Sequence, residues 1–124
     1  MASNRAKIPL TIVRGSTLNT AFTWSTGDCK TALTPVDLTG ASARLQVRES
    51  PESAVLFELS TADGTIVLNE QPGKVRYLMT PVQTMAVQPL AAAAAYDLEI
   101  TFADGSVVNN VFGPVTVESR LTHG

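Results

Sequence analysis

The stretch from Ala95 to Glu118 reads AYDLEITFADGSVVNNVFGPVTVE, and it decides the fold. Apolar and polar side chains alternate from Tyr96 to Phe102, which is the pattern of a β-strand with one buried face. The Asp104-Gly105 pair then supplies the positive φ angles that a tight hairpin turn needs, and a second extended run begins at Val107. The stretch therefore predicts a central antiparallel hairpin, around which the other strands are arranged.

Alternation of the same kind recurs along most of the chain. It predicts further strands over 8–14, 18–24, 42–48, 54–60, 66–68 and 75–79. Turn signals such as Asp63-Gly64 and Gln71-Pro72-Gly73 separate them at spacings of roughly 8 to 12 residues, which are typical of sandwiches and barrels. We therefore expect an all-β protein, an antiparallel β-sandwich of about 7–9 strands.

The phase of the alternation predicts which side chains face the core. Those expected to face inward in the strands at 42–48 and 54–60 are Ala43, Leu45, Val47, Val55, Phe57 and Leu59. Pro9 lacks a backbone donor, so the first strand is expected at a sheet edge. The phase is lost between Asn109 and Pro114, which predicts a bulge or kink there. The run from Ala91 to Ala95 is expected to form a loop or a lead-in to the next strand.

One short helix is predicted near residues 81–88. Thr80 suits the N-cap, Pro81 the first helical position and Gln83 the reciprocal position of a capping box, while Pro89 ends the helix. A helix of about two turns suits a connector across one end of the sandwich. The side chains expected to cover the open rim of the core from this segment are Val82, Met85 or Met79.

The composition indicates one globular domain. The 124 residues are 44% hydrophobic and 16% charged, which favours a chain with a single buried core over a disordered one. We expect a polar N-terminal arm over 1–7, the sandwich domain over 8–119 and a C-terminal tail over 120–124. The arm lacks the pattern of a signal peptide or a membrane helix, so synthesis in the cytoplasm is expected.

Charge and residue counts argue against most chemistry. The net charge of -2 gives no bulk attraction to nucleic acid or to an anionic membrane. The single Cys29 and the single His123 are too few for a disulfide, a zinc site or a catalytic triad. The acidic residues fall in turns and on outward faces rather than in opposed pairs. We therefore predict no enzyme activity, no catalytic or metal-binding residues and no cofactor.

Charged residues of both signs are expected on neighbouring outward faces. Arg44 and Arg48 lie at outward positions of one strand, and Asp97 and Glu99 at outward positions of another. If these strands are neighbours, opposite charges meet across the ladder at roughly 0.2 to 1 kcal/mol per pair. The phase therefore predicts that Arg44 or Arg48 approaches Asp97 or Glu99.

Two aromatic residues leave a functional alternative open. Trp24 is the only tryptophan and is expected to be a core plug, since large aromatic side chains mostly serve packing. The alternative is a carbohydrate- or receptor-binding sandwich that uses Trp24 or Tyr77 as a stacking platform. Burial of Trp24 favours a scaffold, and exposure beside polar loops favours sugar recognition.

A set of short motifs carries a resemblance over about positions 8 to 119. The motifs are PVDLTG (35–40), ARLQVR (43–48), AVLFELS (54–60), the capped helix TPVQT (80–84), AYDLEI (95–100), the turn at Asp104-Gly105 and GPVTV (113–117). In this order they resemble small structural proteins of tailed bacteriophages and prophages. More loosely, the chain is similar to the N-terminal β-sandwich modules of phage upper baseplate proteins, which anchor receptor-binding proteins.

The resemblance implies a virion building block. It implies an Ig-like sandwich without catalytic residues that docks onto tail, baseplate, fibre or capsid components. We therefore expect a non-enzymatic structural or adaptor protein, with other phage structural proteins as partners and a homo-oligomer within the particle. Its expected location is the virion, after synthesis in the host cytoplasm.

Overall fold

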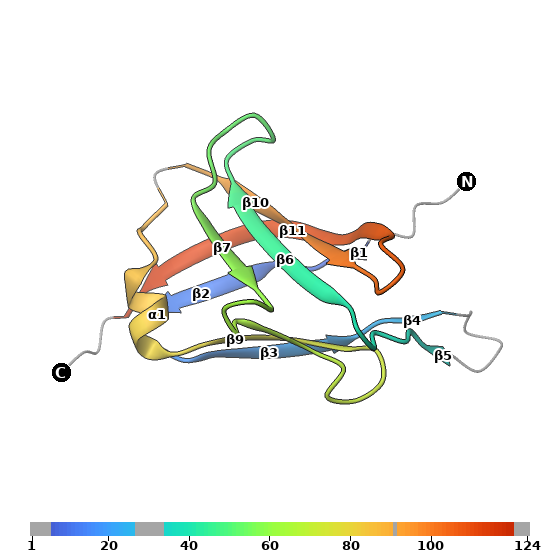
Figure 1. The fold of residues 1–124 in the computed structure, drawn as a ribbon. Coiled ribbons are helices and arrows are strands. Elements are labelled where there is room, and N and C mark those ends of the chain that lie inside the picture. Colours follow the sequence, from blue (N-terminus) through green and yellow to red (C-terminus); the bar gives the residue numbers. More distant parts are fainter. Residues whose placement is uncertain (1–5, 27–33, 91, 121–124) are drawn as a thin grey trace.

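The computed structural model describes residues 6–26, 34–90 and 92–120. Two β-sheets pack face to face, and a short helix lies at one end of the sandwich (Figure 1). Most of the predicted arm (1–5), the segment with Cys29 (27–33), Ala91, and most of the predicted tail, with His123 (121–124), lie outside the described residues.

The larger sheet has the strand order β1-β11-β10-β6-β7, and β2 also pairs with β11. Its strands are β1 (Ala6–Lys7), β2 (Leu10–Arg14), β6 (Ser42–Arg48), β7 (Phe57–Ser60), β10 (Ala94–Thr101) and β11 (Val107–Ser119). The smaller sheet has the order β3-β9-β8, with β3 (Leu18–Thr23), β8 (Ile66–Leu68) and β9 (Lys74–Met79). A separate two-stranded ribbon joins β4 (Ser25–Thr26) to β5 (Thr34–Pro35).

This strand order is that of an immunoglobulin-like sandwich. In the nomenclature of that fold, β3, β9 and β8 take the places of strands B, E and D, and β11, β10, β6 and β7 those of G, F, C and C′. The predicted all-β sandwich is therefore confirmed. The prediction of a wholly antiparallel arrangement is wrong at one edge, because β1 and β2 pair in parallel with β11. Pro9 lies between them at this edge, as predicted.

The core lies between the two sheets and follows the predicted alternation. Ala43, Leu45 and Val47 are buried on β6, and alternate residues from Ala94 to Ile100 are buried on β10. Val55 is an exception, because its side chain is 37% exposed. Pairing of β7 with β6 begins only at Phe57, so Val55 precedes the strand and its predicted inward position is wrong.

The central hairpin of β10 and β11 contains the predicted bulge. Leu98 pairs with Val111 and Ile100 with Val108, so β11 has one more residue than β10 between these two pairs. The extra residue lies at Asn109-Asn110, inside the range where the alternation loses its phase. Strand β11 then continues through Gly113 to Ser119 without a break. The end of the alanine run is the predicted lead-in, since β10 begins at Ala94.

Helix α1 (Pro81–Ala86) has the predicted N-terminus. The Thr80 hydroxyl accepts a hydrogen bond from the Gln83 backbone, and the Gln83 side chain accepts one from the Thr80 backbone. The helix ends at Ala86, two residues earlier than predicted, because Val87 already has an extended backbone.

The buried side chain of α1 is a threonine that the sequence analysis did not identify. The Thr84 hydroxyl accepts a 3.0 Å bond from the Gly15 amide and donates a 2.8 Å bond to the Ser16 carbonyl. Both bonds tie the helix to the turn between β2 and β3. Met79 packs in the core as predicted, whereas Val82 and Met85 are exposed, so their predicted role as core cover is wrong.

Candidate functional site

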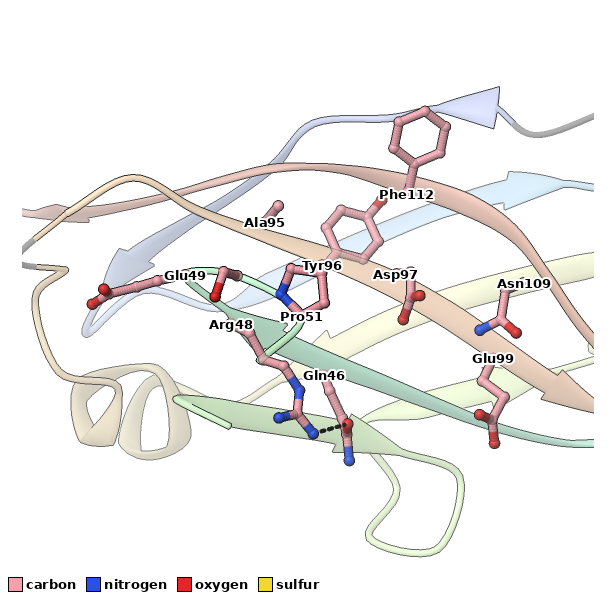
Figure 2. Close-up of a pocket in the computed structure, with 11 residues that line it drawn as sticks. Gln46, Arg48, Glu49, Pro51, Ala95, Tyr96, Asp97, Glu99, Asn109 and Phe112 are labelled. Atoms are coloured by element: carbon pink, nitrogen blue, oxygen red, sulfur yellow. Dashed lines mark hydrogen bonds between the residues drawn. The ribbon is translucent and has the colours of Figure 1, made fainter. Parts of the chain in front are cut away.

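An open groove of about 480 Å³ lies on the outer face of the larger sheet. Figure 2 shows its side chains projecting from β6, β10 and β11 and from the loop that follows β6. The residues that line it are Gln46, Arg48, Glu49, Ser50, Pro51, Ala95, Tyr96, Asp97, Glu99, Asn109 and Phe112. The groove is therefore built across three neighbouring strands rather than at the end of the sandwich.

The strand register explains why these side chains meet. Asp97 in β10 pairs with Gln46 on one side and with Phe112 on the other. Directly paired residues of antiparallel strands project from the same face of the sheet. Tyr96 and Leu98 face the core, so the residues between and beside them face outward. The same alternation therefore places one set of side chains in the core and the other set in the groove.

One ion pair links the basic strand β6 to the acidic strand β10 on this face. Arg44 and Glu99 form an ion pair of 3.3 Å, which confirms the predicted contact between the two sets of charges. Arg48 pairs with Ala95, which offers it no carboxylate. Its guanidinium instead donates to the Gln46 side chain at 3.0 Å, drawn in Figure 2, and to the Ser53 carbonyl.

Asp97 differs from Arg48 and Glu99, the other charged residues that project into the groove from its strands, whereas Glu49 in the loop after β6 is likewise exposed and has no partner among the described residues. The Asp97 side chain is exposed, and among the described residues it has no hydrogen-bond or ion-pair partner. Its neighbour on β11 is the half-buried ring of Phe112. A carboxylate beside an aromatic surface offers a partner both a charge and an apolar contact.

The arrangement of the groove is suited to binding by surface contacts. Asp97 and Glu99 lie two residues apart on one strand, whereas glycoside hydrolysis needs two carboxylates on either side of a bond. The described residues contain no cluster of three metal-ligating side chains. No helix in the described part of the chain is long and apolar enough to cross a membrane.

Other acidic residues are engaged in turns, as predicted. The Asp104 carboxylate accepts bonds of 2.7 Å from the Ser106 hydroxyl and 2.9 Å from its amide. These two bonds lower the pKa of Asp104 below its usual value. Asp63 likewise accepts a 3.0 Å bond from the Thr65 amide. Carboxylates engaged in this way stabilise hairpin turns and have few acceptor sites free to bind a ligand.

The two aromatic residues considered for sugar stacking are not equivalent. Tyr77 is 2% exposed and cannot contact a ligand, so its proposed role as a platform is wrong. Trp24 is half-buried, packs against the core and contacts the Phe102 ring with centroids 5.8 Å apart. This packing agrees with the predicted role of Trp24 as a plug at the end of β3.

A second, shallower surface surrounds helix α1 and was missed in the sequence analysis. Val82 is 81% exposed, and it lines a shallow hollow with Met85, Pro81 and Arg120. Val82 and Met85 are three residues apart and therefore share one helix face, which is the signal that the sequence contains. The signal was misleading because the same spacing is typical of a face packed on a core.

No protein-family model matches the sequence, and no curated protein matches it. Among solved structures, the chain is similar to extracellular domains 3–5 of Drosophila OTK, with 18% identity, a TM-score of 0.35 and coverage of 95% of this chain and 35% of that one. It is also similar to murine CRIg, with 11% identity, a TM-score of 0.35 and coverage of 90% and 92%. The present chain thus spans about a third of the Drosophila structure. The assignment to an immunoglobulin-like sandwich rests on strand order.

Proposed function

We propose that this protein is a non-enzymatic structural or adaptor protein of a tailed-phage particle. It docks onto tail, baseplate, fibre or capsid components through the groove on the outer face of β6, β10 and β11. Several copies are arranged by the symmetry of the particle, and the site of action is the virion. Binding rests on surface complementarity, without a cofactor or a covalent step.

The observation that carries the docking role is the chemistry of the groove. It combines charges of both signs, amide side chains and an aromatic ring on one open face of a sheet. Protein interfaces commonly combine an apolar centre with a polar rim in this way. Asp97 lies in the middle of the face without a partner among the described residues, so it is the residue that we expect to contact the docking protein.

The sequence motifs support the assignment to a phage particle. The PVDLTG turn at 35–40 leads into β6, and the AYDLEI segment at 95–100 forms most of β10. With GPVTV at 113–117 in β11, the motifs that carry the resemblance fall on all three strands that build the groove. The carbohydrate-binding alternative has less support, because Tyr77 is buried and Trp24 packs against Phe102.

Incorporation into particles tests the proposal. Particles are purified from cells that make the wild-type chain, Asp97→Lys or Glu118→Lys, and the protein content of the particles is measured by quantitative mass spectrometry. Glu118→Lys is the matched control, because Glu118 is exposed on β11 outside the groove and the charge change is the same.

We expect Asp97→Lys to reduce incorporation at least about tenfold, because a lysine at this position would repel the positive partner group that Asp97 faces. Glu118→Lys should leave incorporation unchanged. Both variants should keep the wild-type free energy of unfolding. Absence of the wild-type chain from purified particles would contradict the assignment to a virion. Equal incorporation of wild type and Asp97→Lys would contradict docking through the groove.

A further inference from the structure

The free edge of β3 is the longest unprotected strand edge in the described part of the chain. Strand β3 (Leu18–Thr23) has six residues and contains neither a charge nor a proline. The other edges are shorter or are blunted: β8 has three residues, β7 contains Glu58, and the β1–β2 edge is interrupted by Pro9 and ends at Arg14. Natural proteins usually protect edges by such devices, and β3 has none of them.

The topology explains why this edge is open. Strand β3 pairs with β9 on one side only. The strand before it, β2, crosses to the larger sheet and pairs with β11 instead. In an immunoglobulin-like sandwich the first strand can cover this position, so its transfer to the other sheet exposes the backbone of β3.

The hydrogen bonds show which residues of β3 present their backbone at the free edge. The Trp24 amide donates to the Gly73 carbonyl at 2.8 Å, in line with the β3–β9 ladder. Backbone groups of an antiparallel strand point to its two sides at alternate residues. Leu18, Thr20 and Phe22 therefore bond to β9. The amides and carbonyls of Asn19, Ala21 and Thr23 point away from it, and they have no partner among the described residues.

We propose that β3 pairs antiparallel with β3 of a second copy of this chain, about a two-fold axis at Ala21. The two smaller sheets then form one continuous six-stranded sheet. In this register Ala21 faces Ala21, and Asn19 faces Thr23 of the other copy. All three outward-pointing residues of each copy are thereby hydrogen-bonded, which no register shifted by two residues achieves.

The side chains agree with this register. The position on the axis holds alanine, whose small side chain leaves room for its own symmetry mate. Thr20 faces Phe22 of the other copy on the inner side, so the exposed threonine covers the half-buried ring. The strand itself carries no charge, and the cation beside it, the Arg76 guanidinium that donates to the Asn19 side chain, is paired with Glu70. The pairing uses neither the groove nor a phage partner, and it therefore goes beyond the proposed docking function.

Charge substitution on the axis tests the pairing. Sedimentation velocity over a range of concentrations measures the dimer dissociation constant of the purified chain, with a reductant present so that Cys29 forms no intermolecular disulfide. The variants are Ala21→Lys and Ala21→Glu, each alone and mixed. Ala62→Lys is the control, because Ala62 is exposed in the turn between β7 and β8 and lies away from β3.

We expect the wild type and Ala62→Lys to dimerise equally. Ala21→Lys and Ala21→Glu should each raise the dissociation constant at least about tenfold, because like charges meet on the axis. Their mixture should form a heterodimer, since opposite charges then meet. Ala21→Pro is a second variant that removes an edge donor without removing a bond to β9, and it should also be monomeric.

Three results would overturn the proposal: a monomeric wild type at every concentration, a dimer that tolerates Ala21→Lys, or a mixture that fails to associate. None of them bears on the groove, because incorporation into particles is measured separately with Asp97→Lys. Failure of the pairing and failure of the docking function are therefore distinguishable.

Discussion

The hydroxyl of Tyr96 donates a 2.6 Å hydrogen bond to the carbonyl oxygen of Ile8, a residue 88 positions earlier in the chain. Gly113 pairs with Tyr96 and lies in β11, between β10 and the segment with Ile8 that joins β1 to β2. A Cβ atom on Gly113 would lie 2.8 Å from the Ile8 carbonyl carbon and would overlap its oxygen. The missing side chain of Gly113 therefore lets the N-terminal edge approach β11 and lets Tyr96 reach it.

Removal of the Tyr96 hydroxyl should destabilise the protein. We expect Tyr96→Phe to lower the free energy of unfolding by about 1 to 2 kcal/mol, because the Ile8 carbonyl loses its hydrogen bond. Urea denaturation measures the change. Tyr77→Phe is the matched control, since the buried Tyr77 hydroxyl has no hydrogen-bond partner among the described residues. Its removal should cost less than about 0.5 kcal/mol, and equal losses in the two variants would refute the role of the Tyr96 bond.

Alkaline pH should destabilise the fold through the same two tyrosines. Burial raises the pKa of Tyr77 far above its usual value, and burial also raises the pKa of Tyr96. Unfolded tyrosines ionise near pH 10, whereas the folded state holds the pKa of both residues above that value, so stability is kept below about pH 10 and falls above it. Urea denaturation between about pH 9 and pH 11 measures the decline. Tyr77→Phe should make it shallower, and an unchanged slope would count against the prediction.

A methyl group at Gly113 should disrupt the N-terminal edge. We expect Gly113→Ala to lower the free energy of unfolding by about 1 to 3 kcal/mol, because the added atom overlaps the backbone of Ile8. Gly105→Ala is a useful comparison, since it adds the same atom in open space at a φ of +90°. Hydrogen exchange should show loss of protection at β1 in the first variant and not in the second. Full protection of β1 in Gly113→Ala would be inconsistent with the close approach.

The ion pair between Arg44 and Glu99 should contribute little. Its side chains are 51% and 35% exposed, so a double-mutant cycle with alanine should give a coupling energy of about 0.2 to 1 kcal/mol. The coupling should decrease in about 1 M salt, where the Debye length is roughly 3 Å. The same cycle on Arg44 and Glu118, which form no ion pair in the described structure, should give no coupling. A large, salt-independent value for the first pair would contradict this account.

The features predictable from the sequence are those encoded locally. Alternation with a period of two residues predicts the buried face of β6 and β10, and with it the outward face that becomes the groove. The capping box of α1 is predictable because Thr80 and Gln83 satisfy each other's backbone within one turn. The bulge is predictable because an extra residue in β11 shifts the phase of everything after it.

The features that escaped prediction depend on distant parts of the chain. Local alternation does not say that β2 pairs with β11 rather than with β3, because either partner would bury Leu10 and Ile12. Valine is common in strands, but Val55 precedes the first paired residue of β7. The alternation predicts which groove residues face outward. It does not predict where the loop after β6 lies, because that position depends on the folding of the whole chain.

The parallel pairing of β2 with β11 also has a mechanical consequence. Because the two strands run the same way, the polypeptide enters the domain at one end of this pair and leaves at the other. Tension applied through the two ends would slide β2 against β11 and strain the whole ladder from Leu10 to Arg14 at once, in shear. Under load, the domain would therefore transmit force along the β2–β11 pair instead of unzipping bond by bond.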